Sequence, residues 1–394
     1  MQTSLADFIR DTPEGREADS ILRKCVHCGF CTATCPTYQV LGDDLDSPRG
    51  RIYLIKRALE GGPVTDRTRL HLDRCLTCRA CETTCPSGVR YGHLVDIGRA
   101  VVEARTVRSP WDRLRRAVLA FGVPRSGLFG TAVRLGRLVG KAPRARAAGA
   151  WPAPRHARRM LALRGCVQPS LAPSINAAAA RVLDSVGVSL LEVPGAGCCG
   201  AVRFHLNYQE AGRDDMRALI DAWWPIVSGS ETEAIVMTAS GCGATVRDYG
   251  HVLANDAQYR GKAERISSMT RDLSEVIDAQ ALPAGRNRGK IAFHSPCTLQ
   301  HGQQIRGKVE ALLTRVGYEL VPVRDAHLCC GSAGAYSLLQ PAIAGELRAR
   351  KLAALEEGAP QAIATANIGC LAHLQQPTAT PVRHWIELVD EALA

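Results

Sequence analysis

The sequence predicts a protein of mixed α+β and α/β class, in which a mainly helical, cysteine-rich domain precedes two pseudo-symmetric α/β lobes. Two observations support this prediction: a cysteine motif that occurs twice near the start of the chain, and a different cysteine pattern that occurs twice in its second half. The 394 residues are enough for about two or three domains. With 46% hydrophobic and 22% charged residues, the composition is that of a folded protein.

The first domain is defined by two copies of the motif C-x2-C-x2-C-x3-C-P, one beginning at Cys25 and the other at Cys75. This is the spacing of bacterial two-cluster ferredoxins, in which the fourth cysteine of each motif ligates the other cluster. We therefore expect a ferredoxin-type domain with two [4Fe–4S] clusters. The predicted ligands are Cys25, Cys28, Cys31 and Cys85 for the first cluster, and Cys75, Cys78, Cys81 and Cys35 for the second.

Zinc and disulfides are the alternative explanations for the 16 cysteines. Zinc ribbons use paired C-x2-C motifs with four ligands per ion, which is not the pattern of three plus one found here. The first residues, MQTSLADFIRDTPEG, lack the apolar stretch of a secretory signal, so we expect a cytoplasmic chain. Disulfides are rare in that reducing compartment, which leaves metal binding as the preferred explanation.

The second half of the chain alternates between short apolar runs and helical stretches, an order typical of α/β units. We expect strands at residues 160–163, 234–238, 290–293 and 361–365, and helices at 174–186 and 309–316. Each expected strand is followed by a loop that contains a cysteine. These features predict lobes at 158–282 and 283–394, after a domain at 1–104 and a connector at 105–157.

The cysteines of the two lobes form an internal repeat. Cys166 precedes Cys198 by 32 positions, and Cys297 precedes Cys329 by the same interval. Each second member opens a Cys-Cys-Gly triplet, and one more cysteine closes each half. The candidate ligands of one or two additional iron–sulfur or metal sites are Cys166, Cys198, Cys199, Cys242, Cys297, Cys329, Cys330 and Cys370. We expect the cysteine loops to converge where the lobes meet.

The triplets and their remote cysteines resemble the cysteine-rich CCG domain of heterodisulfide reductases and of flavin-linked hydroxyacid dehydrogenases. In the fullest form of that motif the last cysteine belongs to a C-x2-C pair, but here Thr245 and His373 replace its second member. Nearly the whole chain, including CVHCGFCTATCPTYQVLGDDLDSPRGRIYLIKRALEGG, resembles the iron–sulfur subunits of glycolate oxidase. The segment 46–51, DSPRGR, is shared more widely, including with the anaerobic glycerol-3-phosphate dehydrogenase subunit.

This resemblance implies an electron-transfer subunit without a substrate site of its own. We find neither a G-x-G-x-x-G motif opening a helix after a strand nor a P-loop, although oxidation of a hydroxyacid needs a two-electron cofactor. FAD is therefore expected on partners, two different glycolate oxidase chains of a heterotrimer, with a membrane quinone as acceptor. The alternatives are the same role with D-lactate, another 2-hydroxyacid or glycerol 3-phosphate, a heterodisulfide reductase-like subunit, or a scaffold whose clusters only stabilise the fold.

The connector is basic and amphipathic. Trp111, together with Leu114, Val118 and Phe121, falls on one helical face, whereas Arg113, Arg115 and Arg116 fall on the other. This pattern predicts either peripheral contact with the inner membrane, through Trp111 and these arginines, or packing between lobes with a solvated basic face. The net charge of +11 does not favour nucleic acid as a partner, because aromatic residues make up only 5% of the chain.

Overall fold

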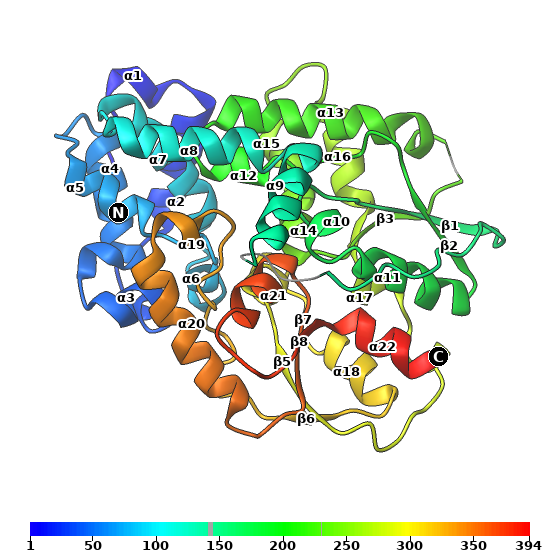
Figure 1. The fold of residues 1–394 in the computed structure, drawn as a ribbon. Helices are drawn as coiled ribbons and strands as arrows, with labels where there is room; N and C mark the ends of the chain where they lie inside the picture. Colours follow the sequence, from blue (N-terminus) through cyan, green and yellow to red (C-terminus); the bar gives the residue numbers. More distant parts are fainter. Residues whose placement is uncertain (141–144, 230) are drawn as a thin grey trace. The chain divides into compact units, whose positions relative to one another are not determined.

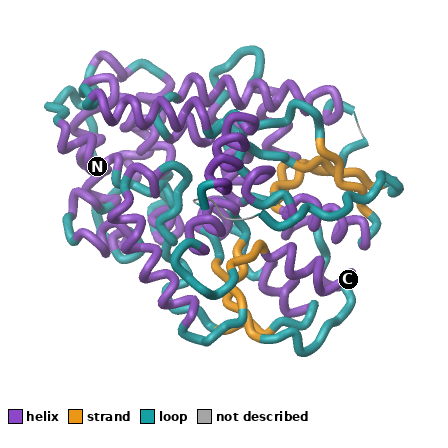
Figure 2. The backbone as a smooth tube through the Cα atoms, in the orientation of Figure 1, coloured by secondary structure: helices purple, strands orange, loops and turns teal. Residues whose placement is uncertain are grey.

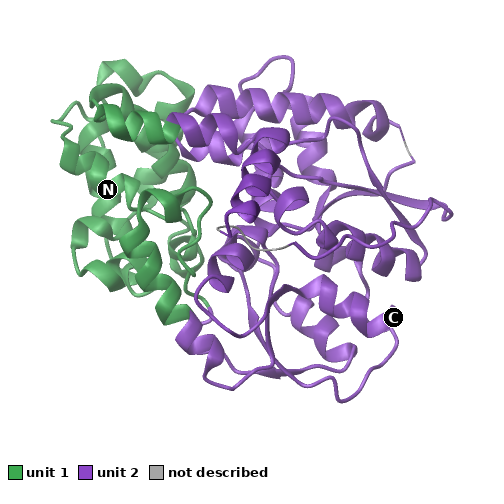
Figure 3. Ribbon diagram, in the orientation of Figure 1, with its two compact units in different colours: residues 1–116, 327–351 green, residues 117–326, 352–394 purple. Residues whose placement is uncertain are grey.

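The computed structural model describes residues 1–140, 145–229 and 231–394, so residues 141–144 of the predicted connector lie outside the described part. The chain forms two compact units (Figure 3). Unit 1 comprises residues 1–116 and 327–351, and unit 2 comprises residues 117–326 and 352–394. The predicted class is confirmed, since the chain combines helices with two parallel sheets (Figure 2).

Unit 1 is helical (Figure 1). Most of the first eight cysteines lie at helix ends or in the loops between helices, whereas Cys81 lies within α6. Thr12 caps α2 and Ser47 caps α4, and each helix begins with a proline, the residue that suits a first helical position. Leu22, Ile55 and Leu94 are fully buried between α2, α4 and α7. The helices are α1 (Asp7–Arg10), α2 (Pro13–Lys24), α3 (Pro36–Leu41), α4 (Pro48–Leu59), α5 (Asp66–Asp73), α6 (Ala80–Thr84), α7 (Tyr91–Arg105) and α19 (Tyr336–Leu339), with 3-10 turns at Phe30–Thr32 and Asp44–Asp46.

Unit 2 contains two four-stranded parallel sheets. The first has the order β2-β1-β3-β4, formed by β1 (Arg158–Ala162), β2 (Val188–Glu192), β3 (Ala234–Met237) and β4 (Thr270–Asp272). The second has the order β6-β5-β7-β8, formed by β5 (Lys290–His294), β6 (Glu319–Val321), β7 (Ala362–Thr365) and β8 (Val382–His384). The two orders are equivalent, as expected for a repeated unit, and all four predicted strands are present.

The helices of unit 2 join the two sheets through one shared core. Helix α11 packs against α22, and Ser174 Oγ donates to the buried Glu387 Oε1 at 2.7 Å between them. The helices are α9 (Ser126–Leu138), α10 (Gln168–Leu171), α11 (Ser174–Ser185), α12 (Ala201–His205), α13 (Gln209–Val227), α14 (Ser240–Arg247), α15 (Tyr249–Val252), α16 (Arg260–Met269), α17 (Leu273–Val276), α18 (Lys308–Arg315), α21 (Ile368–Gln375) and α22 (Trp385–Leu393). Helices α8 (Pro110–Gly122) and α20 (Pro341–Glu356) have residues in both units.

Among the described residues, no helix combines the length and the apolar character needed to cross a bilayer.

Candidate metal centres

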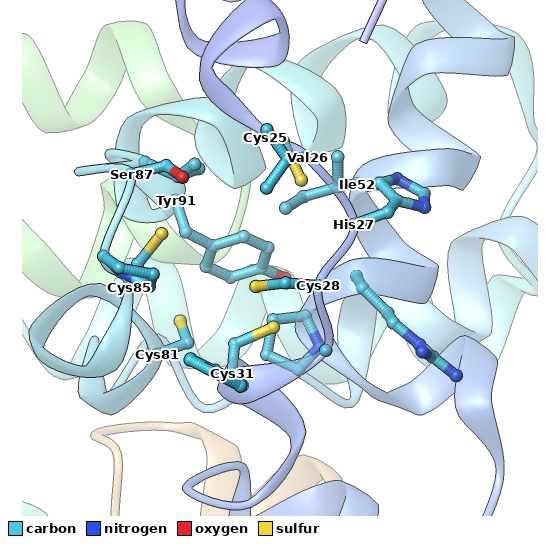
Figure 4. A pocket seen from close by; sticks show the side chains of 16 residues that line it. Cys25, Val26, His27, Cys28, Cys31, Ile52, Cys81, Cys85, Ser87 and Tyr91 are labelled. Carbon is cyan, nitrogen blue, oxygen red and sulfur yellow. The ribbon is translucent and has the colours of Figure 1, made fainter.

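The four cysteines predicted for the first cluster line one hollow in unit 1 (Figure 4). Cys25 ends α2, Cys28 and Cys31 follow in the next loop, and Cys85 ends α6. Their sulfurs gather around this hollow, which is also lined by Tyr91 and by Cys81, a ligand predicted for the second cluster. Burial raises the pKa of the Cys31 thiol to about 11, so deprotonation of this side chain requires a nearby positive charge such as iron.

The second predicted set also comes together in unit 1. Cys35 precedes Pro36, which begins α3, while Cys81 lies in α6. Burial, followed by the nearby sulfurs of Cys78, Cys75 and Cys35, raises the pKa of Cys81 far above its ordinary value. Thus the fourth cysteine of the first motif lies beside the first three of the second motif, the arrangement that the crossed ligand assignment requires.

The two motifs share an unusual backbone conformation that the spacing alone does not reveal. His27 and Thr77 occupy equivalent positions and have φ values of 57° and 53°, and Gly29 and Arg79 have values of 85° and 60°. Non-glycine residues in this left-handed region cost about 1–3 kcal/mol each. Such turns direct successive amides toward a common centre, and Thr77 N–H donates to the Cys75 sulfur at 3.4 Å. Gly29 is the one sequence signal of this feature.

The segment 46–51 forms a buried polar cluster beside the second set. Arg51 is only 1% exposed and donates to His71 O at 2.7 Å and to Thr37 Oγ1 at 3.1 Å. Its Nη1 also lies 4.0 Å from Cys35 Sγ, within hydrogen-bonding reach of sulfur. Asp46 accepts from Arg51 at 3.3 Å, and the segment therefore packs next to Cys35 of the second predicted set.

Residues from the second half of the chain also belong to unit 1. Tyr336 is buried, and its hydroxyl donates to Arg74 O at 3.1 Å, next to the predicted ligand Cys75. Burial raises the pKa of Tyr336, and the sulfurs of Cys75 and Cys329 both lie near enough to contribute. Tyr336 therefore lies near both the second cysteine set and the second Cys-Cys-Gly triplet, a placement that the sequence did not indicate.

The first Cys-Cys-Gly group assembles within unit 2, because its members follow three adjacent parallel strands. Cys166 follows β1, Cys198 and Cys199 follow β2, and Cys242 lies in α14 after β3. Loops at the carboxyl ends of neighbouring parallel strands meet at one edge of a sheet. The thiols of Cys166 and Cys199 hydrogen-bond to Cys198, and Cys199 also contacts Cys242. Four sulfurs are thus brought together.

Cys198 is the hydrogen-bond acceptor of this group. Hydrogen bonds from the thiols of Cys166 and Cys199 lower the pKa of Cys198, and the Gly200 amide contributes in the same direction. Burial, followed by the negative charge of Cys198, raises the pKa of Asp215 to about 6. Metal binding deprotonates cysteine thiols. The four buried or half-buried sulfurs of this group are therefore a suitable donor set for a thiophilic metal or an iron–sulfur cluster.

Both triplets need their glycine for the same physical reasons. Gly200 has a φ of 82°, and a Cβ there would lie 2.5 Å from a backbone carbonyl of α13. Gly331 has a φ of 89°, and its Cβ would lie 2.7 Å from a backbone carbonyl of α20. In each triplet the glycine N–H donates to the first cysteine sulfur at 3.4 Å, so the turn directs an amide at the candidate ligand.

The second group is divided between the two units. Cys297 follows β5 and Cys370 lies in α21 after β7, and both belong to unit 2. Cys329 and Cys330 belong to unit 1. Their order along the chain matches that of the first group, strand by strand, as the repeat predicts.

Within unit 2, Asn367 connects the cysteine loops of the two lobes. Its side-chain carbonyl accepts from Gly241 N at 3.3 Å, directly before Cys242, and its amide donates to Cys370 Sγ at 3.4 Å. Helix α14 also packs against the π-helical turn Thr298–Gly302, which follows Cys297. These contacts bring loops from both lobes together, in agreement with the expected convergence.

The residues proposed for membrane contact divide into two sets. Trp111 in α8 is 67% exposed and Arg113 is also exposed. Arg115 is half-buried and donates to a backbone carbonyl, whereas Arg116 is 6% exposed and pairs with Asp73 at 3.1 Å. Arg116 is thus not part of an exposed basic face, because its charge is neutralised inside unit 1.

Comparison with known proteins identifies the family of this chain. A model of the 4Fe-4S dicluster domain matches residues 21–89, and a model of the cysteine-rich CCG domain matches residues 160–247 and 291–375. The chain is 53% identical to the glycolate oxidase iron-sulfur subunit of Escherichia coli K12, covering 100% of this chain and 99% of that protein. The chain belongs to the family of glycolate oxidase iron–sulfur subunits.

Other relatives match the chain at lower identity. The probable glycolate oxidase iron-sulfur subunit of Bacillus subtilis 168 is 28% identical, with 90% of this chain and 88% of that protein covered. Lactate utilization protein A of Anoxybacillus flavithermus is 24% identical over 51% of this chain and 84% of that protein. A hypothetical protein from Helicobacter pylori has a similar fold, with a TM-score of 0.51 at 9% identity, covering 97% of this chain and 73% of that one.

Proposed function

We propose that this glycolate oxidase subunit is the electron-transfer chain of a flavin-dependent complex that oxidises glycolate to glyoxylate. Electrons from FAD on two different partner chains pass to this subunit and then to a membrane quinone. The observation that carries the proposal is the pair of crossed cysteine sets in unit 1, in a chain 53% identical over its full length to the Escherichia coli subunit.

Two [4Fe–4S] clusters fit the residues present, because each set supplies four sulfurs in the crossed arrangement of two-cluster ferredoxins. Cys25, Cys28, Cys31 and Cys85 would hold the first cluster, and Cys35, Cys75, Cys78 and Cys81 the second. Bound clusters supply one-electron redox chemistry, which connects a two-electron flavin to its acceptor. The chain's own residues hold the ligands, exclude water from the second site and direct amides at the sulfurs.

The Cys-Cys-Gly groups are the proposed continuation of this path. The four sulfurs after β1, β2 and β3 suit a third metal site, and Tyr336 lies near the second cysteine set and near Cys329 of the second triplet. The C-x2-C pairs that typify heterodisulfide reductases are missing in both halves. Glycolate is preferred to lactate as the substrate of the complex because the lactate utilization relatives match only about half of this chain.

The proposal is tested by EPR spectroscopy of the complex purified without oxygen, recorded before and after addition of glycolate. We expect glycolate to produce reduced-cluster signals, and D-lactate or glycerol 3-phosphate to produce them poorly. If dithionite reduces the clusters but glycolate does not, the glycolate assignment is wrong, and whichever alternative donor reduces them identifies the substrate. Clusters that no donor reduces would instead support a structural role.

We further propose that α8 contacts the cytoplasmic face of the inner membrane. Trp111, Leu114, Val118 and Phe121 are all exposed on this helix, and Arg113 is available for anionic lipid headgroups. Replacing Trp111 and Phe121 with Ser should reduce flotation of the complex with anionic liposomes. Arg116 is left unchanged in this test because it is buried. Unchanged flotation would exclude membrane contact by this face, and loss of the flavin subunits would assign it to a protein interface.

A further inference from the structure

Arg51 is the most deeply buried cation next to a predicted cluster ligand in unit 1. Its guanidinium is 1% exposed, its Nη1 is 4.0 Å from Cys35 Sγ, and Cys75 is close enough to stabilise its charge. Hydrogen bonds to His71 O and Thr37 Oγ1 hold the planar group in this position. A fixed positive charge therefore lies beside two of the four sulfurs of the second set.

The surrounding charges do not cancel this cation. Asp46 is fully buried, and its carboxylate is shared between Arg51 at 3.3 Å and Arg74 at 2.8 Å. Two guanidinium groups on one carboxylate leave a net positive charge. Arg99 also donates to Cys75 O at 2.7 Å, which adds a second buried guanidinium to the same side of the site.

The cations near the first set are less buried than Arg51. Arg49 is half-buried and pairs with the exposed Asp44 at 2.8 Å, and the terminal ammonium of Met1, also half-buried, donates to Cys25 O at 2.8 Å. Cys28 of this set is itself exposed, so water screens charges there. Two cysteine sets with the same motif are thus placed in different electrostatic surroundings.

Hydrogen bonds, nearby charge and solvent exposure tune the reduction potential of a cluster held by four thiolates. Reduction adds a negative charge. Burial opposes this added charge, whereas a neighbouring cation stabilises it, most strongly where water is excluded. The buried position of Cys35, Cys75 and Cys81 alone would make the second cluster harder to reduce, and a fixed cation opposes that effect.

We propose that Arg51 sets the reduction potential of the second cluster, keeping it reducible in its buried site. Arg51 acts as a positioning and charge-compensating residue, and Asp46 limits its effect. This inference rests on the proposed electron-transfer function for its physiological meaning, but the effect on the potential is measurable whatever reduces the complex.

The experiment is an EPR-monitored redox titration of the intact complex, with iron content and visible absorption measured in parallel. Arg51→Gln removes the charge, and we expect the potential of the second cluster to fall. We expect this fall to shift the electron's equilibrium between the two clusters at least tenfold, which corresponds to about 59 mV for a one-electron couple. A Cys78→Ser variant identifies which signal belongs to the second cluster.

The matched control is Arg108→Gln. Arg108 is also a buried arginine of unit 1, but its partners are Asp73, Glu103 and Asp112, and no cysteine contributes to its environment. We expect this variant to leave both potentials unchanged. An equal shift in the two variants would overturn the proposal, because it would then reflect a general loosening of unit 1.

Two further variants keep the test decisive if Arg51→Gln fails to assemble. Asp46→Asn removes the opposing charge and should raise the potential of the second cluster. Arg51→Lys keeps the positive charge and should leave that potential unchanged. A fall in Asp46→Asn, or no change in any variant with normal iron content, refutes the role of charge. If these shifts occur but glycolate reduces neither cluster, the inference stands and the proposed function fails.

Discussion

His384 is a single buried side chain that connects the two sheets of unit 2 and makes the stability of this unit depend on pH. It is fully buried at the start of α22, where Nδ1 accepts from Ile386 N at 3.3 Å and Nε2 donates to Thr238 O at 2.8 Å. Thr238 follows β3 of the first sheet, whereas His384 ends β8 of the second. Burial lowers the pKa of His384 to about 4, although Glu387 acts in the opposite direction.

A histidine kept neutral by burial should make unit 2 less stable in mild acid. As the pH falls from about 6.5 to about 4, the unfolded chain binds a proton that the folded chain does not, so stability decreases through this range. Below pH 4 the loss in the free energy of unfolding is about 3 kcal/mol. We expect urea titrations of His384→Asn to show lower stability at pH 7.5 but a weaker dependence on pH. The same pH dependence in both proteins would contradict this account.

Helix α22 is the element that makes the two lobes one folding unit. Its residues Ile386 and Val389 are fully buried in a core that also contains Met160 and Val182 from the first lobe. Arg181 of α11 pairs with Asp390 of α22 at 2.6 Å, which adds a polar contact at the edge of this core. The last helix of the chain therefore stabilises the first sheet as well as its own.

Shortening Ile386 to Ala should weaken both sheets together. The cavity left by this substitution is expected to cost about 2–5 kcal/mol in the free energy of unfolding. Hydrogen exchange should speed up in β1 and β3 as much as in β5 and β7, because the core is shared. Leu393→Ala, at the half-buried end of the same helix, should cost less. Faster exchange confined to the second sheet would show that the lobes unfold independently.

The whole molecule distributes its sixteen cysteines over two units with different surroundings. The eight of the first domain lie in unit 1, and the first Cys-Cys-Gly group lies entirely in unit 2. Cys199→Ser should therefore remove metal from the unit 2 group while the EPR signals of unit 1 remain.

In the complete complex, Cys199→Ser should leave reduction of the partner flavin by glycolate intact and slow the reduction of quinone. Stopped-flow absorbance at the flavin and quinone bands measures both steps. Thr245→Ser, in α14 three residues after Cys242 and not a predicted ligand, is the control. Quinone reduction at the normal rate in Cys199→Ser would make this group structural.

Several features were predictable because they depend on local spacing or on repetition. The motifs at Cys25 and Cys75 predict crossed ligand sets, and the repeat predicts the equivalent strand orders of the two sheets. The strands predicted near 160–163 and 290–293 are confirmed, since short buried runs between turn residues are a reliable signal. The four-segment division of the chain and the ligand assignments stay predictions.

Other features depended on the tertiary structure, because burial is a property of neighbours distant in the chain. Arg51 and Arg116 look like ordinary surface arginines in the sequence, yet one lies beside Cys35 and the other pairs with Asp73 inside unit 1. The sequence by itself determined the chemistry, because iron–sulfur ligation requires particular residues at particular intervals. Only the tertiary structure decided where the second Cys-Cys-Gly triplet lies and which charges the second cluster meets, because packing of α4, α7 and residues 327–351 places those groups.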